Sequence, residues 1–414
     1  MGKPDKNGRL VIVGAGHAGG SLAGQLRQQG YGGSITLLGQ ESSPPYMRPP
    51  LSKAWLKGEA QEQDLLLRAP GFYAEQDIDL RLGCTAQSLD LHSRLLRCAD
   101  GSTVAFDQLV MATGARAREL DVPGRDLGGV HQLRELGHAQ ALQKALSRAR
   151  RLAIVGGGFI GLEVAATARA LGVEVHVLEQ QPRLLARVAS EPLSAYLEHL
   201  HRSRGVMLEL GVQVQALLGE GGVRGVRLAD GRELEADAVL IGVGSVPNTE
   251  LLQQAGLDCQ AGIPVDDCAR SPWAPVYAIG DVTLRPSVNG AWRRLESVPS
   301  ALEQARQLAL HLCGLPVGEP DVPWFWSDQY EAKLQMAGLA PPGAQTHVLG
   351  DVQAGKFCVL HLDGTRLLAA ECVNAPADFM QARKAIAQGR ELDLDKLSAG
   401  GAVKLAAVLA AVPA

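Results

Sequence analysis

The chain has 414 residues, of which 46% are hydrophobic and 20% charged, and its formal net charge is −4 at pH 7. This length allows two or three domains with a large core, and the composition is that of an ordinary globular protein. The acidic balance argues against a nucleic-acid partner and no apolar run is long enough to span a bilayer, so neither nucleic acid nor a membrane is expected as a partner.

The first residues, MGKPDKNG, lack the apolar core of a signal peptide, and a cytoplasmic protein is therefore expected. An apolar strand from Leu10 then leads into Gly14, Gly16 and Gly19 in G-x-G-x-x-G spacing. Such a turn brings the backbone close to a dinucleotide pyrophosphate, which binds at the N-terminus of the following helix. The pattern predicts a first dinucleotide-binding unit.

The next predicted strand, residues 34–38, ends where the ribose of the dinucleotide binds in such a unit. The ribose position falls at Gln40 or Glu41, of which only Glu41 carries a charge. The choice between them stays open at this point.

A proline-rich stretch, SSPPYMRPP, follows and is expected to be stiff and non-helical. Ser52 follows it after Leu51 and is predicted to be the N-cap of a helix. On residue type alone, Arg48 and Lys53 are expected to be solvent-facing charges.

Residues 77–110 have the pattern of short strands separated by turns, and Gly101 is predicted to close a hairpin. A buried strand, residues 108–112, then ends at Thr113 and Gly114. A small polar residue and a glycine at a strand end can lie against a cofactor.

A second glycine turn, in RLAIVGGGFIGLE, repeats the first. Its glycines, Gly156, Gly158 and Gly161, each lie 142 residues after their counterparts and follow a buried strand at 152–155. A repeat at this distance is too long for a solenoid and indicates two dinucleotide-binding domains in one chain, one for an electron donor and one for an acceptor.

A carboxylate follows the next predicted strand, residues 173–178. Glu179 lies 18 residues after Gly161, where it can accept hydrogen bonds from a ribose diol and would repel a 2′-phosphate. This favours NADH over NADPH.

Three further elements complete the two repeats. In the segment RELEADAVLIGVGSVPN, a strand ends at Gly242 and Gly244, as the corresponding strand of the first half ends at Gly114. A buried strand at 276–279 is followed by Gly280 and Asp281, and the Asp281 carboxylate is placed to bind a ribityl hydroxyl. The stretch around 298–312 predicts an amphipathic helix whose N-terminus faces a group that becomes anionic. Its apolar face is predicted to contain Leu302, Ala305, Leu308, Ala309 and Leu312.

The last part of the chain differs in composition, with Trp324, Phe325 and Trp326 in sequence. Strands are predicted near 346–350 and 357–362, followed by a helix at 377–388. The apolar tail, residues 402–412, is too short to span a membrane and is expected to pack on the core.

The seven cysteines are dispersed, without a C-x-x-C pair, and none precedes Cys84. We interpret them as buried, reduced thiols and expect neither a disulfide nor a metal site. A flavoenzyme with two dinucleotide-binding domains and these cysteines is therefore expected to pass its electrons on without a dithiol or a sulfenic acid.

In this order, the motifs GAGHAG, RPPLSK, ATGA, GGGFIGLE, YAIGD, RLESVPSALEQA and WFWSDQ resemble those of the NADH-dependent, FAD-containing ferredoxin reductases of bacterial oxygenase systems, of the putidaredoxin reductase type. The resemblance covers nearly the whole chain. It implies an α/β fold of the glutathione reductase type, with two Rossmann-like domains and a C-terminal α+β domain. The implied boundaries are 1–117 and 246–322 for the FAD domain, 118–245 for the NAD domain and 323–414 for the C-terminal domain.

The glycine turns, the strand ends and the resemblance together give the predicted site. The FAD contacts are Gly14, Gly16, Ala18, Gly19, Gln40, Glu41, Arg48, Lys53, Ala86, Thr113, Gly114, Arg134, Asp281, Val298 and Trp326. The NAD contacts are Gly156, Gly158, Ile160, Gly161, Glu179 and Gly244. The resemblance places Arg48 and Trp326 close to the flavin ring and pairs Lys53 with Glu163 beside it, as the catalytic residues.

The resemblance also implies a reaction in which NADH passes a hydride to FAD and single electrons leave to a [2Fe-2S] ferredoxin that serves an oxygenase such as a cytochrome P450. The partner is expected to bind transiently and electrostatically, with Arg293, Arg294, Arg383 and Lys384 as candidate contacts on a monomer.

Other functions share these motifs. A rubredoxin reductase, a monodehydroascorbate reductase, and a binding flavoprotein similar to apoptosis-inducing factor are the alternatives. A long-lived charge-transfer complex with NADH, without ferredoxin reduction, would favour the binding flavoprotein.

Overall fold

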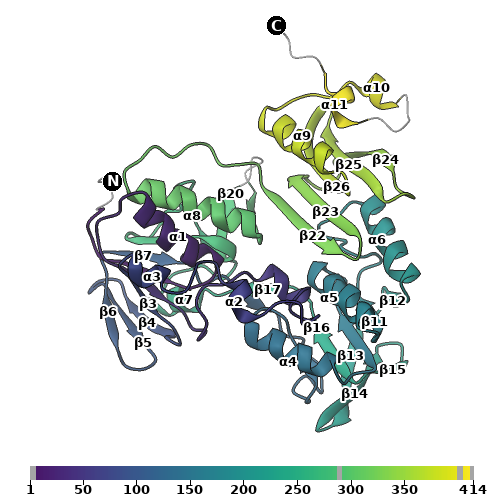
Figure 1. The fold of residues 1–414 in the computed structure, drawn as a ribbon, viewed down its shortest axis with the longest axis horizontal. Helices are drawn as coiled ribbons and strands as arrows, with labels where there is room; N and C mark the ends of the chain where they lie inside the picture. Colours follow the sequence, from purple (N-terminus) through teal and green to yellow (C-terminus); the bar gives the residue numbers. More distant parts are fainter. Residues whose placement is uncertain (1–5, 287–290, 399–403, 411–414) are drawn as a thin grey trace. The chain divides into compact units, whose positions relative to one another are not determined.

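The computed structural model describes residues 6–286, 291–398 and 404–410 and consists of two compact units (Figure 1). Unit 1 comprises Met1–Arg48, Gln61–Arg116 and Ser245–Asp321, and unit 2 comprises Pro49–Ala60, Ala117–Gly244 and Val322–Ala414. Within the described ranges, no helix has the length and apolar character needed to cross a membrane.

Unit 1 is built on a five-stranded parallel sheet. Its strand order is β19-β7-β1-β2-β3, formed by β1 (Leu10–Val13), β2 (Ile35–Leu38), β3 (Ile78–Arg81), β7 (Gln108–Met111) and β19 (Val276–Ala278). All four strand pairs are parallel. All of β1 is buried, as expected for a parallel sheet that is covered on both faces.

Side chains alternate between the two faces of this sheet. Leu10 and Ile12 share a core with α1 (His17–Gln28) and α8 (Val298–Leu312), which lie side by side in Figure 1. Val11 and Val13 belong to a second core that includes residues of the antiparallel strands β5 (Leu95–Cys98) and β6 (Thr103–Ala105).

Smaller elements complete unit 1. They are β4 (Ala86–Asp90), β5 (Leu95–Cys98), β6 (Thr103–Ala105), α2 (Glu62–Leu65), α3 (Phe72–Glu75), α7 (Glu250–Gln254), β18 (Ile263–Pro264), η2 (Gly280–Val282), β20 (Thr283–Pro286) and β21 (Trp292–Arg293). A two-stranded pair of β8 (Ala115–Ala117) and β17 (Ser245–Pro247) lies at the two points where the chain passes from one unit to the other.

Unit 2 contains a second parallel sheet, ordered β12-β11-β10-β16-β9. Its elements are β9 (Val130–His131), β10 (Arg151–Val155), β11 (Glu174–Glu179), β12 (Val206–Leu210) and β16 (Ala238–Ile241), with α4 (Leu136–Leu146), α5 (Phe159–Ala170) and α6 (Glu191–Ser203). An antiparallel sheet of β13 (Val214–Glu220), β14 (Gly222–Leu228) and β15 (Glu233–Glu235) accompanies it. The second half thus repeats the first, as the sequence predicts.

The C-terminal part of unit 2 is a five-stranded antiparallel sheet, ordered β22-β23-β26-β25-β24. Its strands are β22 (Trp324–Gln329), β23 (Ala332–Gly338), β24 (Gln345–Asp351), β25 (Lys356–Asp363) and β26 (Arg366–Val373). A core shared with this sheet also includes residues of α9 (Pro376–Ala387), α10 (Leu394–Ser398) and α11 (Leu405–Val408). In the described part of the tail, Leu405 and Val408 are buried in this core, as predicted; residues 402, 403, 411 and 412 lie outside the described residues.

The predicted helix that begins at Ser52 is wrong. Residues Pro49–Ser52 form a short 3₁₀ helix, η1, and irregular turns follow up to Gly58. Gly58 has a φ of +75° and ends the segment. The Ser52 hydroxyl does not cap a helix because it donates to the carboxylate of Glu163, as described below.

Two further predictions need correction. Leu302 is 38% exposed, and Ala301 takes its place in the α1–α8 core because it shares a helix face with Ala305 and Leu308. In the C-terminal part, β22, β23 and β26 were not predicted. Their apolar residues do not alternate strictly, since this sheet is covered by helices on one face and by α5 at its β22 edge.

The three-domain division stays a prediction. Unit 2 combines the second Rossmann-like part with the C-terminal sheet and with the twelve-residue segment Pro49–Ala60.

Candidate functional site

The two glycine turns share one geometry. Gly14 and Gly156 have φ values of +113° and +110°, and a Cβ atom on either would overlap a backbone carbonyl, that of Ala112 or of Gly242. The third glycine of each turn packs against the carbonyl of the first, so any side chain there would push the helix away from the sheet. Glycine is therefore required at the first and third positions by packing alone.

The middle glycines differ, because they face open space. A Cβ atom on Gly16 or Gly158 would meet none of the described atoms within 4 Å. Both residues are the N-caps of their helices, α1 and α5, and neither helix has a side-chain cap or an acidic residue in its first turn. By contrast, Ser190 and Ser297 cap α6 and α8. The residues at these two turns thus fit a dinucleotide pyrophosphate, which approaches the backbone at the middle glycine and accepts from uncapped amides.

The carboxylate of Glu179 is already oriented by the second turn. Its Oε2 atom accepts a hydrogen bond from the amide of Gly157 at 2.6 Å, and Oε1 accepts from the amide of Gln181 at 2.7 Å. A carboxylate has further lone pairs for ribose hydroxyls. The structure therefore holds Glu179 at the end of β11, next to the glycine turn, where the sequence predicts it.

The corresponding position in unit 1 is organised differently. Glu41 accepts hydrogen bonds from the Tyr46 hydroxyl at 2.5 Å and from Nη2 of Arg48 at 2.8 Å, whereas Gln40 is exposed. Arg48 is thus paired with a carboxylate and also lies over the Tyr46 ring, at 5.3 Å from its centroid. This corrects the expectation, based on residue type, of a solvated arginine.

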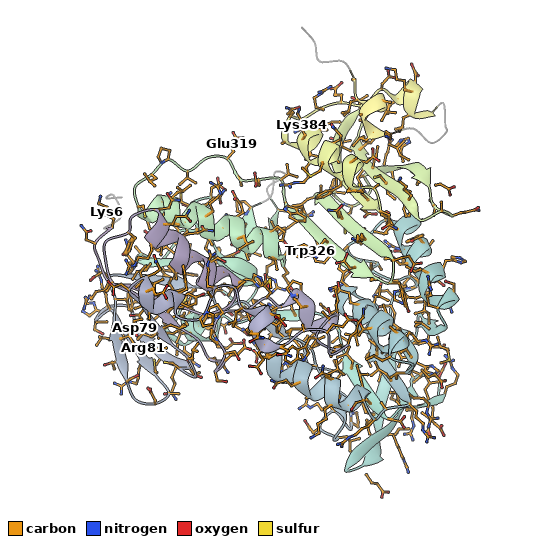
Figure 2. The ribbon with its side chains drawn as sticks, viewed as in Figure 1. Lys6, Asp79, Arg81, Glu319, Trp326 and Lys384 are labelled. Atoms are coloured by element: carbon orange, nitrogen blue, oxygen red, sulfur yellow. The ribbon has the colours of Figure 1, made fainter. Side chains whose placement is uncertain are left out.

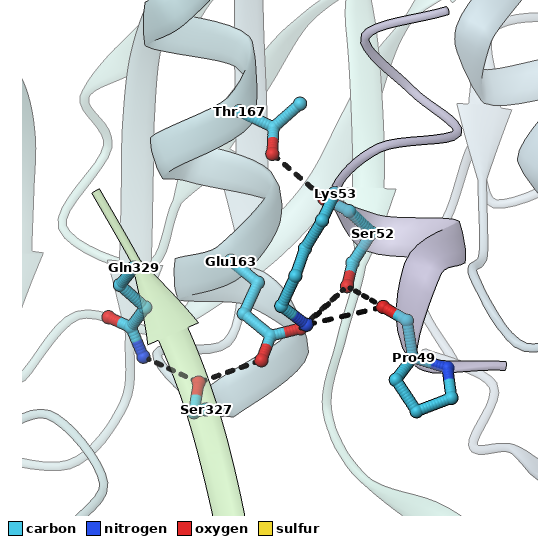
Figure 3. A network of polar contacts seen from close by, with 7 residues as sticks. All are labelled: Pro49, Ser52, Lys53, Glu163, Thr167, Ser327 and Gln329. Atoms are coloured by element: carbon cyan, nitrogen blue, oxygen red, sulfur yellow. Dashed lines mark hydrogen bonds and ion pairs between the residues drawn. The ribbon is translucent and has the colours of Figure 1, made fainter. Parts of the chain in front are cut away.

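Several hydrogen bonds and an ion pair meet at Glu163 in unit 2 (Figure 3). Nζ of Lys53 lies 2.6 Å from Oε2 of Glu163 and also donates to the carbonyl of Pro49 at 3.2 Å. The Ser52 hydroxyl donates to the same carboxylate oxygen at 2.5 Å, and the Ser327 hydroxyl donates to Oε1 at 2.7 Å. Only 4% of Glu163 is exposed. The carboxylate thus accepts on both oxygens, which offsets the cost of burying its charge.

The local sequence explains how this group forms. Glu163 is on the first turns of α5, directly after the second glycine turn, whereas Ser52 is the last residue of the 3₁₀ helix η1 and Lys53 follows it. The Thr167 hydroxyl, one turn further along α5, donates to the Ser52 carbonyl at 2.8 Å. Lys53 is therefore not the solvent-facing charge that its residue type suggests.

Thr113 also has a defined partner in unit 1. Its hydroxyl donates to the carbonyl of Asn248 at 2.6 Å, and the Asn248 amide donates back to the Thr113 carbonyl at 2.9 Å. The Thr113 hydroxyl thus connects the segment that ends at Arg116, where the chain leaves unit 1, to the segment that begins at Ser245, where the chain returns.

The remaining predicted contacts divide between the units. Ala18, Ala86, Gly114, Asp281 and Val298 belong to unit 1; Arg134, Ile160, Gly244 and Trp326 belong to unit 2. Ile160, close to the open Gly158, is 45% exposed.

Trp326 lies on β22, and its ring is 5.5 Å from that of Trp324 (Figure 2). Arg383, one of the candidate partner contacts, lies over Trp324 at 5.3 Å, and Arg294 forms an ion pair with Glu296 at 2.6 Å. These two arginines are engaged within the protein. Lys384, on α9, is exposed (Figure 2).

The cysteines are free. Two pairs lie close together, Cys84 with Cys98 and Cys358 with Cys372, with sulfur atoms 2.9 Å and 2.8 Å apart. The second pair faces across the β25–β26 ladder. Burial raises the pKa of Cys84 to about 12, and the hydrogen bond from its neighbour together with burial raises the pKa of Cys372. The protonated thiols are poor nucleophiles.

Sequence reasoning missed Ser327, Gln329 and His201, and it assigned Ser52 the wrong role. The relevant signal is the alternation of Ser327 and Gln329, which places both on one face of β22. The preceding WFW run hides it, because three consecutive aromatic residues do not show which face is buried.

Three comparisons with known proteins bear on this site. The family model for pyridine nucleotide-disulphide oxidoreductases matches residues 8–305, and that for the reductase C-terminal domain matches residues 324–409. A probable ferredoxin reductase of Castellaniella defragrans is 45% identical over 94% of this chain and 96% of its own. Putidaredoxin reductase of Pseudomonas putida is 40% identical over 92% of each chain.

Among solved structures, the covalent complex of putidaredoxin reductase with putidaredoxin contains a chain that matches 95% of this one. The TM-score is 0.92 at 38% sequence identity, and 96% of that chain is covered. The similarity therefore extends through both glycine turns and the C-terminal sheet.

Proposed function

Because this chain belongs to the pyridine nucleotide-disulphide oxidoreductase family, and within it to the ferredoxin reductases, we propose that it transfers a hydride from NADH to FAD and passes single electrons to a [2Fe-2S] ferredoxin that serves an oxygenase such as a cytochrome P450. FAD and NADH are its cofactors. The observation that supports the proposal most is the similarity, over nearly the whole chain, to a reductase solved as a complex with its ferredoxin-type partner.

We further propose the three domains predicted above, a cytoplasmic location, and a monomer that binds its partner transiently.

Bound FAD supplies a group that accepts a hydride and gives up electrons singly. The residues of the chain bind and orient the two nucleotides. The α5 N-terminus at Gly158 would bind the NADH pyrophosphate, and Glu179 would accept hydrogen bonds from its ribose hydroxyls. Glu163 holds the Lys53 ammonium, for which we propose a contact with the flavin that stabilises the negative charge gained on reduction.

No acid or base is needed for hydride transfer, since alignment and charge stabilisation suffice. The raised pKa values of Cys84 and Cys372 agree with a path that avoids sulfur. The fixed partners of Glu163 keep the site preorganised before the nucleotide arrives.

Replacing Glu179 with alanine is expected to weaken the preference for NADH. The ratio of kcat/KM for NADH to that for NADPH should fall about tenfold or more, because the variant loses acceptors for the ribose diol and repulsion of a 2′-phosphate. Steady-state kinetics with both nucleotides give this ratio. Glu174→Ala, at the exposed start of the same strand, is the control and should leave the ratio unchanged. An unaltered ratio in Glu179→Ala would contradict the assignment.

The overall function is tested with the purified, FAD-loaded protein. With NADH and a candidate [2Fe-2S] ferredoxin under anaerobic conditions, we expect bleaching of the iron-sulfur absorbance, at a rate that falls as salt is added. Rubredoxin and monodehydroascorbate serve as alternative acceptors. Faster reduction of either acceptor than of any ferredoxin would reject the proposal, and so would a persistent charge-transfer band without ferredoxin reduction.

A further inference from the structure

The ion pair of Lys53 and Glu163 is one end of a longer chain of buried polar groups in unit 2. Beyond Ser327, the Gln329 side-chain amide donates to the Ser327 oxygen at 3.1 Å, and the Gln329 carbonyl lies 2.9 Å from Nε2 of His201 (Figure 3 shows the chain up to Gln329). Ser327, Gln329 and His201 are each at most 1% exposed. Such a chain in a core is costly unless each member has its partner.

The donors in this chain all point toward Glu163. Ser327 gives its only hydrogen to the carboxylate, so its oxygen can only accept from Gln329. The Gln329 carbonyl must then accept from the His201 ring. Burial lowers the pKa of His201, so the ring is neutral and this pattern assigns its hydrogen to Nε2. Donors aligned in one direction polarise one another and strengthen the last bond, which is the one to Glu163.

The two carboxylate oxygens have different tasks. Oε2 of Glu163 is shared by the Lys53 ammonium and the Ser52 hydroxyl, whereas Oε1 accepts from Ser327. Without the Ser327 hydroxyl, Oε1 would lose the donor that fixes the plane of the carboxylate. Rotation to find a new donor would then move Oε2 and the ammonium bound to it.

From this geometry we propose that Ser327 and Gln329, on β22 of the C-terminal sheet, are positioning residues for Lys53. They fix the Glu163 carboxylate and thereby the ammonium that stabilises reduced flavin. The inference rests on the proposed function, because it concerns flavin reduction by NADH. It assigns a part in that step to the C-terminal sheet, whose side chains act through Glu163.

The structure offers a matched control. The Ser190 hydroxyl also donates to a buried carboxylate in unit 2, that of Glu371, which is 3% exposed and lies 3.2 Å from Nε2 of His361. Ser190→Ala therefore removes the same type of hydrogen bond at a similar depth, together with the N-cap of α6. None of the described hydrogen bonds of Ser190 or Glu371 reaches Glu163 or Lys53.

The test compares full-length, FAD-loaded wild type, Ser327→Ala and Ser190→Ala. In Ser327→Ala, stopped-flow reduction by NADH is expected to slow about tenfold, as for loss of one donor to a buried charge, with NADH affinity unchanged. The midpoint potential of bound FAD should become more negative, because the ammonium is less well placed. Ser190→Ala should change neither quantity. Gln329→Leu, a second variant, should shift both in the direction of Ser327→Ala by a smaller amount.

A double-mutant cycle with Glu163→Gln separates positioning from general stability. If Ser327 acts through Glu163, adding Ser327→Ala to the Glu163→Gln variant should have little further effect. This applies both to the midpoint potential of bound FAD and to the urea midpoint of the FAD-free chain. If Glu163→Gln does not fold, Lys53→Met is the background for the potential. An unchanged rate and potential in Ser327→Ala overturns the inference, as does an effect of full size in the double variant. A wild type that NADH cannot reduce would instead reject the proposed function itself.

Discussion

Replacement of Lys53 with alanine is expected to slow the reduction of bound FAD by NADH about a hundredfold, the usual effect of removing a preorganised electrostatic group. The ammonium is held by Glu163 at 2.6 Å and by the Pro49 carbonyl, so it does not need to reorganise during the reaction. Stopped-flow absorbance of the flavin measures this rate. An unchanged rate would refute the assignment of Lys53.

The same substitution leaves the Glu163 carboxylate buried without its cation. Such a loss costs about 3–5 kcal/mol in a dry interior; we expect about 2 kcal/mol, because the Lys53 side chain is 21% exposed and Ser52 and Ser327 still donate. Lys57→Ala is the control, since Lys57 is 37% exposed and 4.0 Å from Glu59. It should alter neither the reduction rate nor the urea midpoint.

Replacement of Gly16 with alanine is expected to weaken FAD binding by about two orders of magnitude while the chain still folds, because the added methyl group fills the space through which the pyrophosphate approaches. Gly16 has a φ of −86°, which alanine adopts without strain, and no described atom lies within 4 Å of the added Cβ. FAD content after purification and the circular dichroism of the apo-protein give the two readings.

The counterpart in unit 2 separates the two nucleotides. Gly158→Ala should keep its FAD and lose affinity for NADH, whereas Gly318→Ala, on an exposed loop, should affect neither. Full FAD content in Gly16→Ala would reject the assignment of the first turn to FAD. Loss of FAD rather than of NADH affinity in Gly158→Ala would reverse the assignment of the two turns.

Local patterns were enough to predict much of this fold. The glycine turns, the buried strands next to them and the repeat between the two halves depend on residues close together in sequence, and the structure contains all of them. Glu179 was predicted from its distance to Gly161, because one helix and one strand fix that spacing.

The rest depends on contacts between distant segments, which spacing does not encode. Ser327 meets Glu163 across 164 residues, and Ser52 meets it across 111. For Ser52, the rules for helix caps pointed to a helix because they consider only the local chain, whereas a buried carboxylate competes for the hydroxyl. Sequence spacing also did not show that the guanidinium of Arg383 lies over the ring of Trp324, 59 residues earlier.

The inclusion of Pro49–Ala60 in unit 2 has a consequence for protein engineering. A chimera that took only residues 117–244 from one reductase and the remainder from another would join a Glu163 and a Lys53 from different parents. The two segments are separated along the gene but are joined by the ion pair of Lys53 and Glu163. Recombination between relatives should therefore succeed most often when both are inherited together.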